Sequence, residues 1–167
     1  FDDLAVISVG DAHLPVAQFA KSATVRVGDT VIAIGSPLGN AGSVTKGVVS
    51  ALHRTIKAGS NSGSAETLQD VLQTDASIDP GNSGGPVIQN GSVVGVAFQG
   101  YSGDVAQNVG YMIPTPVISR FLKDVADGHY DRYMDLSIGV FNTLNPAMRK
   151  ALNLTEDDRG VLVTSVS

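Results

Sequence analysis

The sequence of 167 residues contains no cysteine. This absence excludes a disulfide scaffold, a zinc site with cysteine ligands and a thiol nucleophile. Histidine is also scarce: only His13, His53 and His129 occur, and no two of them have the spacing of a helical metal site. Any covalent chemistry must therefore use serine, threonine, lysine or a carboxylate, and we expect no metal ion and no other cofactor.

Long apolar runs and basic runs are missing too. No segment approaches the roughly 18 apolar residues of a membrane-spanning helix, and the first residues lack the pattern of a signal peptide. The formal net charge of −5 and the pI near 4.9 come without a basic cluster, so we expect no nucleic-acid partner. With 43% hydrophobic and 16% charged residues, the composition is that of a soluble globular protein with a real core.

Short apolar runs broken by glycine, proline and small polar residues fill residues 4–113, as in "TVIAIG", "GVVSAL" and "VVGVAF". This alternation and the β-branched residues predict an all-β barrel or sandwich rather than alternating strands and helices. Turn signals occur at Gly28-Asp29, Gly39-Asn40 and Asn90-Gly91, and the last is the strongest hairpin signal. Residues 56–67 are rich in glycine, serine and asparagine, which predicts a loop.

The pattern changes at "PTPVISRFLKDVADG", where apolar residues recur at the spacing of one helix face. Thr115 is predicted as the N-cap, Pro116 as the first helical residue and Gly128 as the residue just past the end. Further on, "LSIGVF", "NPAMRKAL" and "GVLVTSV" predict a strand, a capped helix and a strand. These elements make only a small core, so we interpret them as the start of a second domain.

The motif "DASIDPGNSGGPV" surrounds Ser83 with Gly81, Gly84 and Gly85. Glycine packs no side chain and reaches positive φ readily, so this composition indicates that the backbone itself has a task. Such a turn exposes a hydroxyl, and the N–H groups of Gly81 and Ser83 converge where a developing oxyanion would sit. The alternative is a glycine-rich hairpin with a solvated serine, and the short motif alone does not decide between the two.

The longer pattern resembles the chymotrypsin-like serine proteases of the HtrA (Deg, DegP-like) family. The resemblance rests on the serine motif, on "VGDTVIAIGSPLGNAGSVTKGVVSAL" before it and on "GSVVGVAFQG" after it. The opening "DDLAVISV" is similar to the family strand that carries the catalytic aspartate, and the tail resembles the first part of an HtrA-type PDZ domain.

This resemblance implies a mostly β fold, the chymotrypsin-like (trypsin-like) antiparallel β-barrel. It implies three parts of the chain: the C-terminal part of a protease domain at 1–114, a connecting helix and linker at 115–133, and part of a PDZ domain at 134–167. A protease domain that lacks most of its first barrel is expected to leave an unpaired strand edge.

The resemblance also implies the roles of the site residues. Ser83 is the nucleophile, and Asp3 is the carboxylate that orients the histidine base. The amides of Gly81 and Ser83, with Asn82 between them, form the oxyanion hole. The substrate contacts implied by the family are Ser77, Ile78 and Asp79 in the specificity pocket, and Phe98, Gln99 and Gly100 as a strand that pairs with the substrate. Because trypsin-like members carry a pocket aspartate where Ser77 stands, we expect a small or apolar side chain before the cleaved bond.

Partners and location follow from the resemblance alone. It implies unfolded or damaged proteins as substrates in protein quality control, apolar chain ends as ligands of the PDZ domain, and a homotrimer. It also implies a periplasmic or other extracytoplasmic location, or an organelle lumen in a eukaryote.

The catalytic histidine of these proteases precedes the aspartate, and this sequence begins two residues before Asp3. His13, His53 and His129 are interpreted as structural or surface residues, so none is assigned as the base. Two interpretations follow. One is a piece of a serine endopeptidase that is inactive by itself. The other is a catalytically dead pseudoprotease that captures extended peptides by strand addition.

Overall fold

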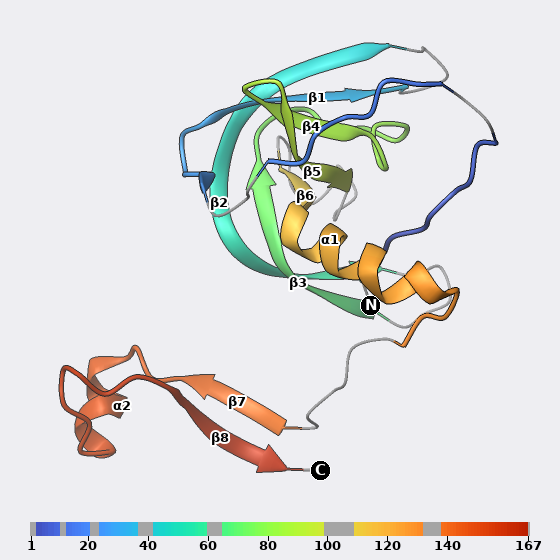
Figure 1. The fold of residues 1–167 in the computed structure, drawn as a ribbon. Coiled ribbons are helices and arrows are strands. Elements are labelled where there is room, and N and C mark those ends of the chain that lie inside the picture. Colours follow the sequence, from blue (N-terminus) through green and yellow to red (C-terminus); the bar gives the residue numbers. More distant parts are fainter. Residues whose placement is uncertain are drawn as a thin grey trace. The chain divides into compact units, whose positions relative to one another are not determined.

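Figure 1 shows the computed structural model of the chain, which describes residues 3–10, 13–20, 24–36, 42–59, 65–98, 109–131 and 138–166. The chain divides into two compact units, Phe1–Asp131 and Arg132–Ser167. The serine motif belongs to the first unit.

Six strands of the first unit close into a barrel in the order β1-β2-β3-β6-β5-β4, and every pairing is antiparallel. The strands are β1 (Thr30–Gly35), β2 (Ser43–Gly59), β3 (Ala65–Thr74), β4 (Pro86–Gln89), β5 (Ser92–Phe98) and β6 (Gly110–Pro114). The predicted antiparallel β-barrel is confirmed. The expectation of an unpaired edge was wrong for these strands, because β1 also pairs with β4 and so joins the two ends of the sheet.

The hairpin between β4 and β5 turns at Asn90 and Gly91, as predicted. Both residues have positive φ, 50° and 77°, which is the backbone of a type I′ turn. Gly28, with φ 92°, lies in the predicted turn before β1. The predicted Gly39-Asn40 turn lies outside the described residues.

Strands β2 and β3 extend into the segment that the sequence predicted as a loop. Ile56 pairs with Leu68 and Lys57 with Thr67, so the loop prediction was wrong for both ends of residues 56–67. Residues 60–64 lie outside the described part of the chain. Ile56 and Leu68 are buried in a small hydrophobic cluster, and this burial extends the strand pairing despite the polar composition nearby.

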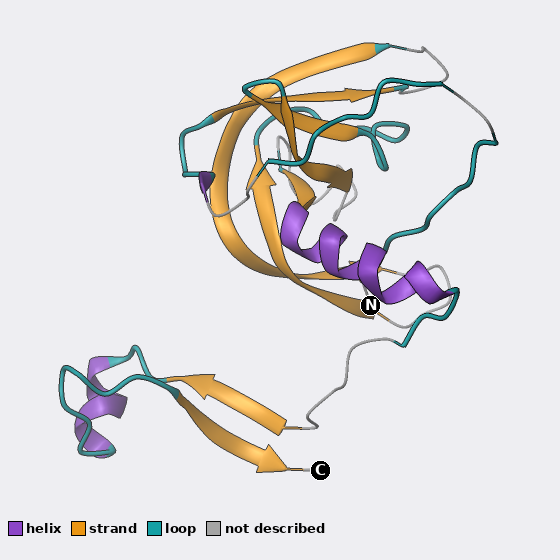
Figure 2. Ribbon diagram, viewed as in Figure 1, coloured by secondary structure: helices purple, strands orange, loops and turns teal. Residues whose placement is uncertain are grey.

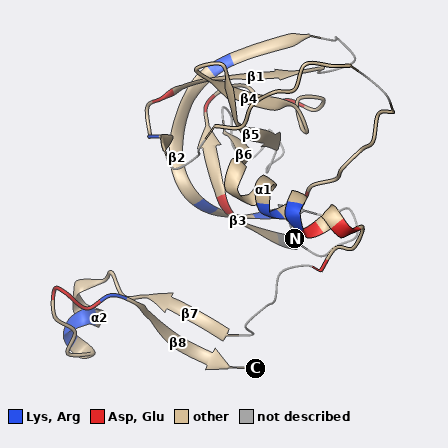
Figure 3. Ribbon diagram, viewed as in Figure 1, with Lys and Arg blue, Asp and Glu red and all other residues tan. Residues whose placement is uncertain are grey.

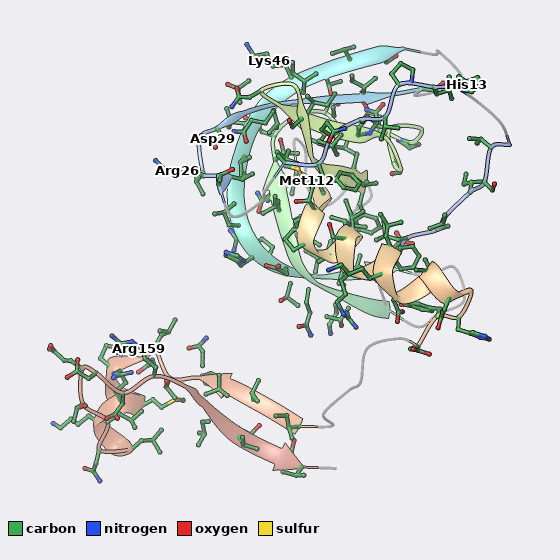
Figure 4. All side chains as sticks on the ribbon, in the orientation of Figure 1. His13, Arg26, Asp29, Lys46, Met112 and Arg159 are labelled. Carbon is green, nitrogen blue, oxygen red and sulfur yellow. The ribbon has the colours of Figure 1, made fainter. Side chains whose placement is uncertain are left out.

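The main hydrophobic core fills the barrel interior. Met112 on β6 is fully buried and lies within the barrel in Figure 4. Around it pack the buried residues Val25, Val31, Ala33, Val49, Leu72, Ile78, Val87, Val94 and Ala97. Because every barrel strand contributes at least one of these side chains, the core couples the serine loop to the whole barrel.

Residues 3–10 form no strand, although "DDLAVISV" was expected to be one. Val6, Ile7 and Val9 in this segment are exposed, at 59%, 84% and 69% of their full accessibility. A strand needs a neighbour for its backbone N–H and C=O groups, and the closed barrel offers it no free edge. Within the described residues, this part of the chain joins the barrel at Phe19, which forms a parallel bridge with Val93 of β5.

The predicted helix after β6 is confirmed as α1 (Thr115–Asp124), followed by a 3-10 turn (Val125–Asp127) that ends at Gly128 with a left-handed φ of 88°. Figure 2 shows this helix against the barrel, and its buried Ile118 and Phe121 account for that packing. Basic and acidic residues both lie along it (Figure 3). Among the described residues, no helix has the length and apolar character needed to span a membrane.

The N-cap prediction for α1 was wrong by one residue. Pro114 occupies the N-cap position without a side-chain cap, and Thr115 is the first helical residue. The Thr115 hydroxyl instead donates a hydrogen bond of 2.8 Å to the carbonyl of Ala20, 95 residues earlier. A tertiary contact therefore uses the side chain that the local pattern assigned to capping.

The second unit contains β7 (Ile138–Asn142), α2 (Pro146–Ala151) and β8 (Val161–Val166), which confirms the predicted strand, helix and strand. Asn145 caps α2, since its side chain accepts hydrogen bonds of 2.9 Å and 3.2 Å from the N–H groups of Ala147 and Met148. Of the residues whose burial is described in this unit, only Thr143 is buried, in agreement with the expected small core.

Candidate active site

The serine motif forms the loop between the end of β3 and the start of β4, and this loop is attached to β2. The carboxylate of Asp75 accepts a hydrogen bond of 2.6 Å from the N–H of Val48, and the hydroxyl of Thr74 donates one of 2.8 Å to the carbonyl of Val48. The same hydroxyl accepts a hydrogen bond from the N–H of Ala76. Asp75 is therefore a structural anchor of the loop.

Asn82 is the central buried residue of the loop, with only 1% of its surface exposed. Its N–H donates to the carbonyl of Asp79 at 2.9 Å, and its own carbonyl accepts from the N–H of Gly85 at 2.8 Å. Its side-chain NH₂ group donates to the carbonyl of Ser77 at 3.2 Å. These three hydrogen bonds hold Asn82 from both sides, so the residues next to it, Gly81 and Ser83, occupy fixed positions.

The amides of the loop fall into two groups. The Gly84 N–H donates to the carbonyl of Ala97 at 2.9 Å, and the Gly81 carbonyl accepts from the N–H of Ser36 at 3.0 Å. In contrast, the N–H groups of Gly81 and Ser83 donate no hydrogen bond within the described part of the chain. Ser83 is exposed, and Gly81 has a φ of 108°, which glycine adopts without strain. The two predicted oxyanion donors are thus among the loop amides that have no acceptor within the described residues.

Two glycines are required by close packing inside the protein. A Cβ at Gly85 would meet the carbonyl oxygen of Ile34 and would lie 2.8 Å from that of Asn82. A Cβ at Gly35, the last residue of β1, would lie 2.6 Å from the Cα of Asn82. Gly85 therefore lets β1 approach the loop closely.

The predicted specificity segment divides between the surface and the core. Ser77 and Asp79 are exposed, and the Ser77 hydroxyl donates a hydrogen bond of 2.8 Å to the Asp79 carboxylate. Ile78 is 7% exposed, belongs to the barrel core and packs against Gly110. The roles of all three residues in substrate binding remain predictions.

The predicted substrate-pairing segment begins at the end of β5. Phe98 is its last residue and pairs with Tyr111 of β6, while Gln99 and Gly100 lie outside the described residues. The neighbouring Ala97 contacts the serine loop directly, because its N–H donates to the carbonyl of Gly85 at 2.8 Å. The end of β5 and the serine loop are therefore adjacent.

Asp3 and the three histidines make no hydrogen bond to the serine loop within the described residues. Asp3 is exposed in the N-terminal segment, and its orienting role stays a prediction. His13 is exposed, the N–H of His129 donates to the side chain of Asp127, and His53 pairs with Asp70.

Sequence reasoning missed Gly35 and the β2 residues that hold the loop. Thr45 donates a hydrogen bond of 2.8 Å from its hydroxyl to the carbonyl of Ser77. A Cβ at Gly47 would lie 2.6 Å from the Cα of Ala76, so this glycine allows β2 to touch the loop backbone. These residues are far from the serine motif in sequence and belong to no short motif. The glycines at 35 and 47 were the one weak sequence signal of a close backbone contact.

The chain is similar to known proteases in sequence and in structure. The family model for the trypsin-like peptidase domain matches residues 1–96. The chain is 44% identical over 144 residues to Protease Do-like 2, chloroplastic, of Arabidopsis thaliana, covering 84% of this chain and 23% of that protein. It is 44% identical over 142 residues to Serine protease Do-like HtrA of Bacillus subtilis, covering 81% of this chain and 31% of that protein.

A solved structure, the HtrA-type protease AlgW with tripeptide, is 29% identical with a TM-score of 0.70 and covers 96% of this chain and 51% of that one. The chain thus spans less than a third of these two curated relatives and about half of the solved chain.

Proposed function

Since this chain belongs to the trypsin-like peptidases, in their HtrA/DegP family, we propose that it is the nucleophile-bearing part of a serine endopeptidase with Ser83 as the attacking residue. The observation that carries the proposal is the arrangement of the loop amides. Asn82 is held by three hydrogen bonds, while the N–H groups on either side of it, at Gly81 and Ser83, have no acceptor within the described residues. Donors placed in advance at a developing oxyanion are the largest contribution to catalysis in acyl transfer.

The reaction proceeds in two steps. The Ser83 hydroxyl attacks the carbonyl carbon of the scissile peptide, a histidine takes its proton, and the amides of Gly81 and Ser83 hold the oxyanion. The histidine then donates the proton to the leaving amine, and water hydrolyses the acyl-enzyme. The histidine comes from outside this sequence, and Asp3 orients it once the complete protease domain is assembled.

The substrates are extended segments of unfolded or damaged proteins. They pair with the end of β5 at Phe98, and with Gln99 and Gly100 beyond it, which brings the scissile bond to the adjacent serine loop. Two features support this: Ala97 of β5 hydrogen-bonds the loop, and related HtrA-type proteases have been solved with peptides.

Ser77, Ile78 and Asp79 form the pocket for a small or apolar side chain. The residues from 134 onward begin a PDZ domain that binds apolar chain ends, and the intact protein is a trimer that acts in extracytoplasmic or organellar quality control.

The test uses the full-length protein, including its natural upstream segment, with a serine-directed fluorophosphonate and unfolded casein. We expect labelling and cleavage that Ser83→Ala abolishes. Ser92→Ala, at the start of β5, is the matched control and should keep both. The chain of 167 residues alone should show negligible turnover because it supplies no base.

The competing function is a pseudoprotease that binds extended peptides without cleaving them. It is favoured by one observation, that no histidine hydrogen-bonds the serine loop within the described residues. A full-length protein that binds unfolded casein, yet is neither labelled nor active, would establish this function and end the proposal of a protease.

A further inference from the structure

The Ser77 carbonyl connects three parts of the first unit. It accepts one hydrogen bond of 2.8 Å from the hydroxyl of Thr45 on β2 and a second of 3.2 Å from the side chain of Asn82. Ser77 belongs to the proposed pocket segment, and Asn82 lies between the two proposed oxyanion donors. One carbonyl thus links a barrel strand, the pocket segment and the oxyanion loop.

We propose that Thr45 is a positioning residue for the serine reaction, because it fixes the Ser77 carbonyl and, through it, Asn82 and the oxyanion donors. This inference rests on the proposed function. Thr45 itself touches neither Ser83 nor the oxyanion donors through any hydrogen bond of the described residues, so its effect is indirect.

The position of Thr45 is set by the barrel. It pairs with Ala33 of β1, and Ala33 is 1% exposed, so this part of β2 is packed in the closed sheet. Two residues further on, a Cβ at Gly47 would meet the backbone of Ala76. Strand β2 therefore lies directly against the loop backbone here, and this brings the Thr45 hydroxyl within hydrogen-bond distance of the Ser77 carbonyl.

A second set of hydrogen bonds also attaches the loop to β2. Val48, three residues after Thr45, exchanges hydrogen bonds with the side chains of Thr74 and Asp75. The loop is consequently tied to β2 at its start, by Thr74 and Asp75, and again at Ser77. The hydrogen bonds at Thr74 and Asp75 attach the loop to the barrel. Of the two attachments, the one at Ser77 involves a carbonyl that is also hydrogen-bonded to Asn82.

Loss of the Thr45 hydroxyl would leave the Ser77 carbonyl with the longer bond to Asn82 alone. The carbonyl would then be free to move, and the Asn82 side chain would follow it. A displacement of the oxyanion donors by a fraction of an ångström weakens their hydrogen bonds to the oxyanion of the transition state more than it weakens substrate binding. The expected signature is a fall in kcat with a smaller change in KM.

The experiment compares three variants of the full-length protein with the parent. Thr45→Val removes the hydroxyl at nearly constant volume, Thr45→Ser keeps it, and Thr67→Val makes the same change at an exposed position of β3 whose side chain has no hydrogen bond within the described residues. We expect Thr45→Val to lower kcat on unfolded casein and the rate of fluorophosphonate labelling by about tenfold or more. Thr45→Ser should recover most of this loss, and Thr67→Val should match the parent.

Hydrogen exchange of the peptide covering residues 79–85 provides a readout that does not depend on activity. It should become faster in Thr45→Val, stay near the parent in Thr45→Ser and remain unchanged in Thr67→Val. The inference is overturned if Thr45→Val keeps the parent's labelling rate and exchange, or if Thr45→Ser is as impaired as Thr45→Val. A parent that is not labelled at Ser83 refutes the proposed protease, and the positioning role is then decided by the exchange data alone.

Discussion

His53 on β2 and Asp70 on β3 form a hydrogen-bonded pair in which Nδ1 of the imidazole and a carboxylate oxygen are 2.5 Å apart. Both residues have left-handed backbones, with φ of 53° and 60°. They lie where the register between β2 and β3 shifts on either side of Arg54. The pair therefore links β2 and β3 where their pairing is irregular, and Asp70 is the structural partner of His53 there.

A double-mutant cycle with His53→Asn and Asp70→Asn measures this pair, because asparagine tolerates the left-handed backbone. Both side chains are well exposed, 79% and 48%, so we expect a coupling free energy of about 0.2–1 kcal/mol from urea unfolding. The coupling should shrink in about 1 M salt, which screens exposed charges. Additive single effects at low salt would show that the pair contributes nothing.

Asp29 should lower the free energy of unfolding as the pH falls into the acid range. The N–H of Arg26 hydrogen-bonds its carboxylate, and this contact, followed by the Gln89 side chain and the Arg26 charge, lowers the pKa of Asp29 from 3.8. Figure 4 shows Arg26 and Asp29 together in the turn before β1. Because the folded-state pKa lies below the unfolded one, this stabilisation is present above the unfolded pKa and is lost as the pH falls through the folded pKa.

The measurement is an NMR titration of the Asp29 carboxyl, together with urea unfolding between about pH 5 and pH 2. Asp29→Asn should reduce the loss of stability over this range. Gln89→Leu should raise the titration midpoint only part of the way to 3.8 because the Arg26 contacts remain. A midpoint at or above 3.8 in the parent protein would refute this account.

Gly35→Ala should disturb the serine loop. The new Cβ would lie 2.6 Å from the Cα of Asn82, so a backbone rather than a flexible side chain must move. We expect a stability loss of about 1–3 kcal/mol in urea unfolding and slower fluorophosphonate labelling of the full-length protein.

The control is Gly91→Ala, in the β4–β5 turn, where φ is 77° and nothing lies within 4 Å of the new Cβ. It should lower stability by about 1–2 kcal/mol through the left-handed backbone alone and leave the labelling rate of the folded protein unchanged. Equal effects of both variants on labelling would argue against a specific contact between Gly35 and Asn82.

Met112→Ala should be strongly destabilising, since Met112 is fully buried among side chains from the other barrel strands. We expect a loss of about 2–5 kcal/mol. Leu122→Ala on α1, where the parent side chain is 40% exposed, is the matched control and should cost much less. Similar losses for the two variants would mean that the barrel interior is not the main core.

Short-range features were predictable from the sequence. The Asn90-Gly91 turn, the helix that ends at Gly128 and the Asn145-capped helix each depend on residues within one turn of each other. The tight turn at Ser83 was predictable for the same reason, because glycines stand on both sides of it and Gly81 and Gly84 have positive φ. These signals are local, and local backbone preferences act before any long-range contact forms.

Long-range contacts decided the rest. The extension of β2 and β3 into a polar segment depends on the burial of Ile56 and Leu68. The Thr115 hydroxyl, which was expected to cap the helix, instead hydrogen-bonds the carbonyl of Ala20, 95 residues away. Closure of the barrel through β1 and β4 left residues 3–10 without a strand partner.

By itself, the sequence determined the serine motif, the turn and helix signals and the strand-rich pattern, because each depends on residues that are neighbours along the chain. Only the tertiary structure showed that Asn82 is held at Ser77 and that Ser77 is held by Thr45, which is 32 residues away along the chain. The physical reason is that a hydrogen bond between a strand and a distant loop forms only after the closed barrel has set both in place, and no local pattern encodes that distance.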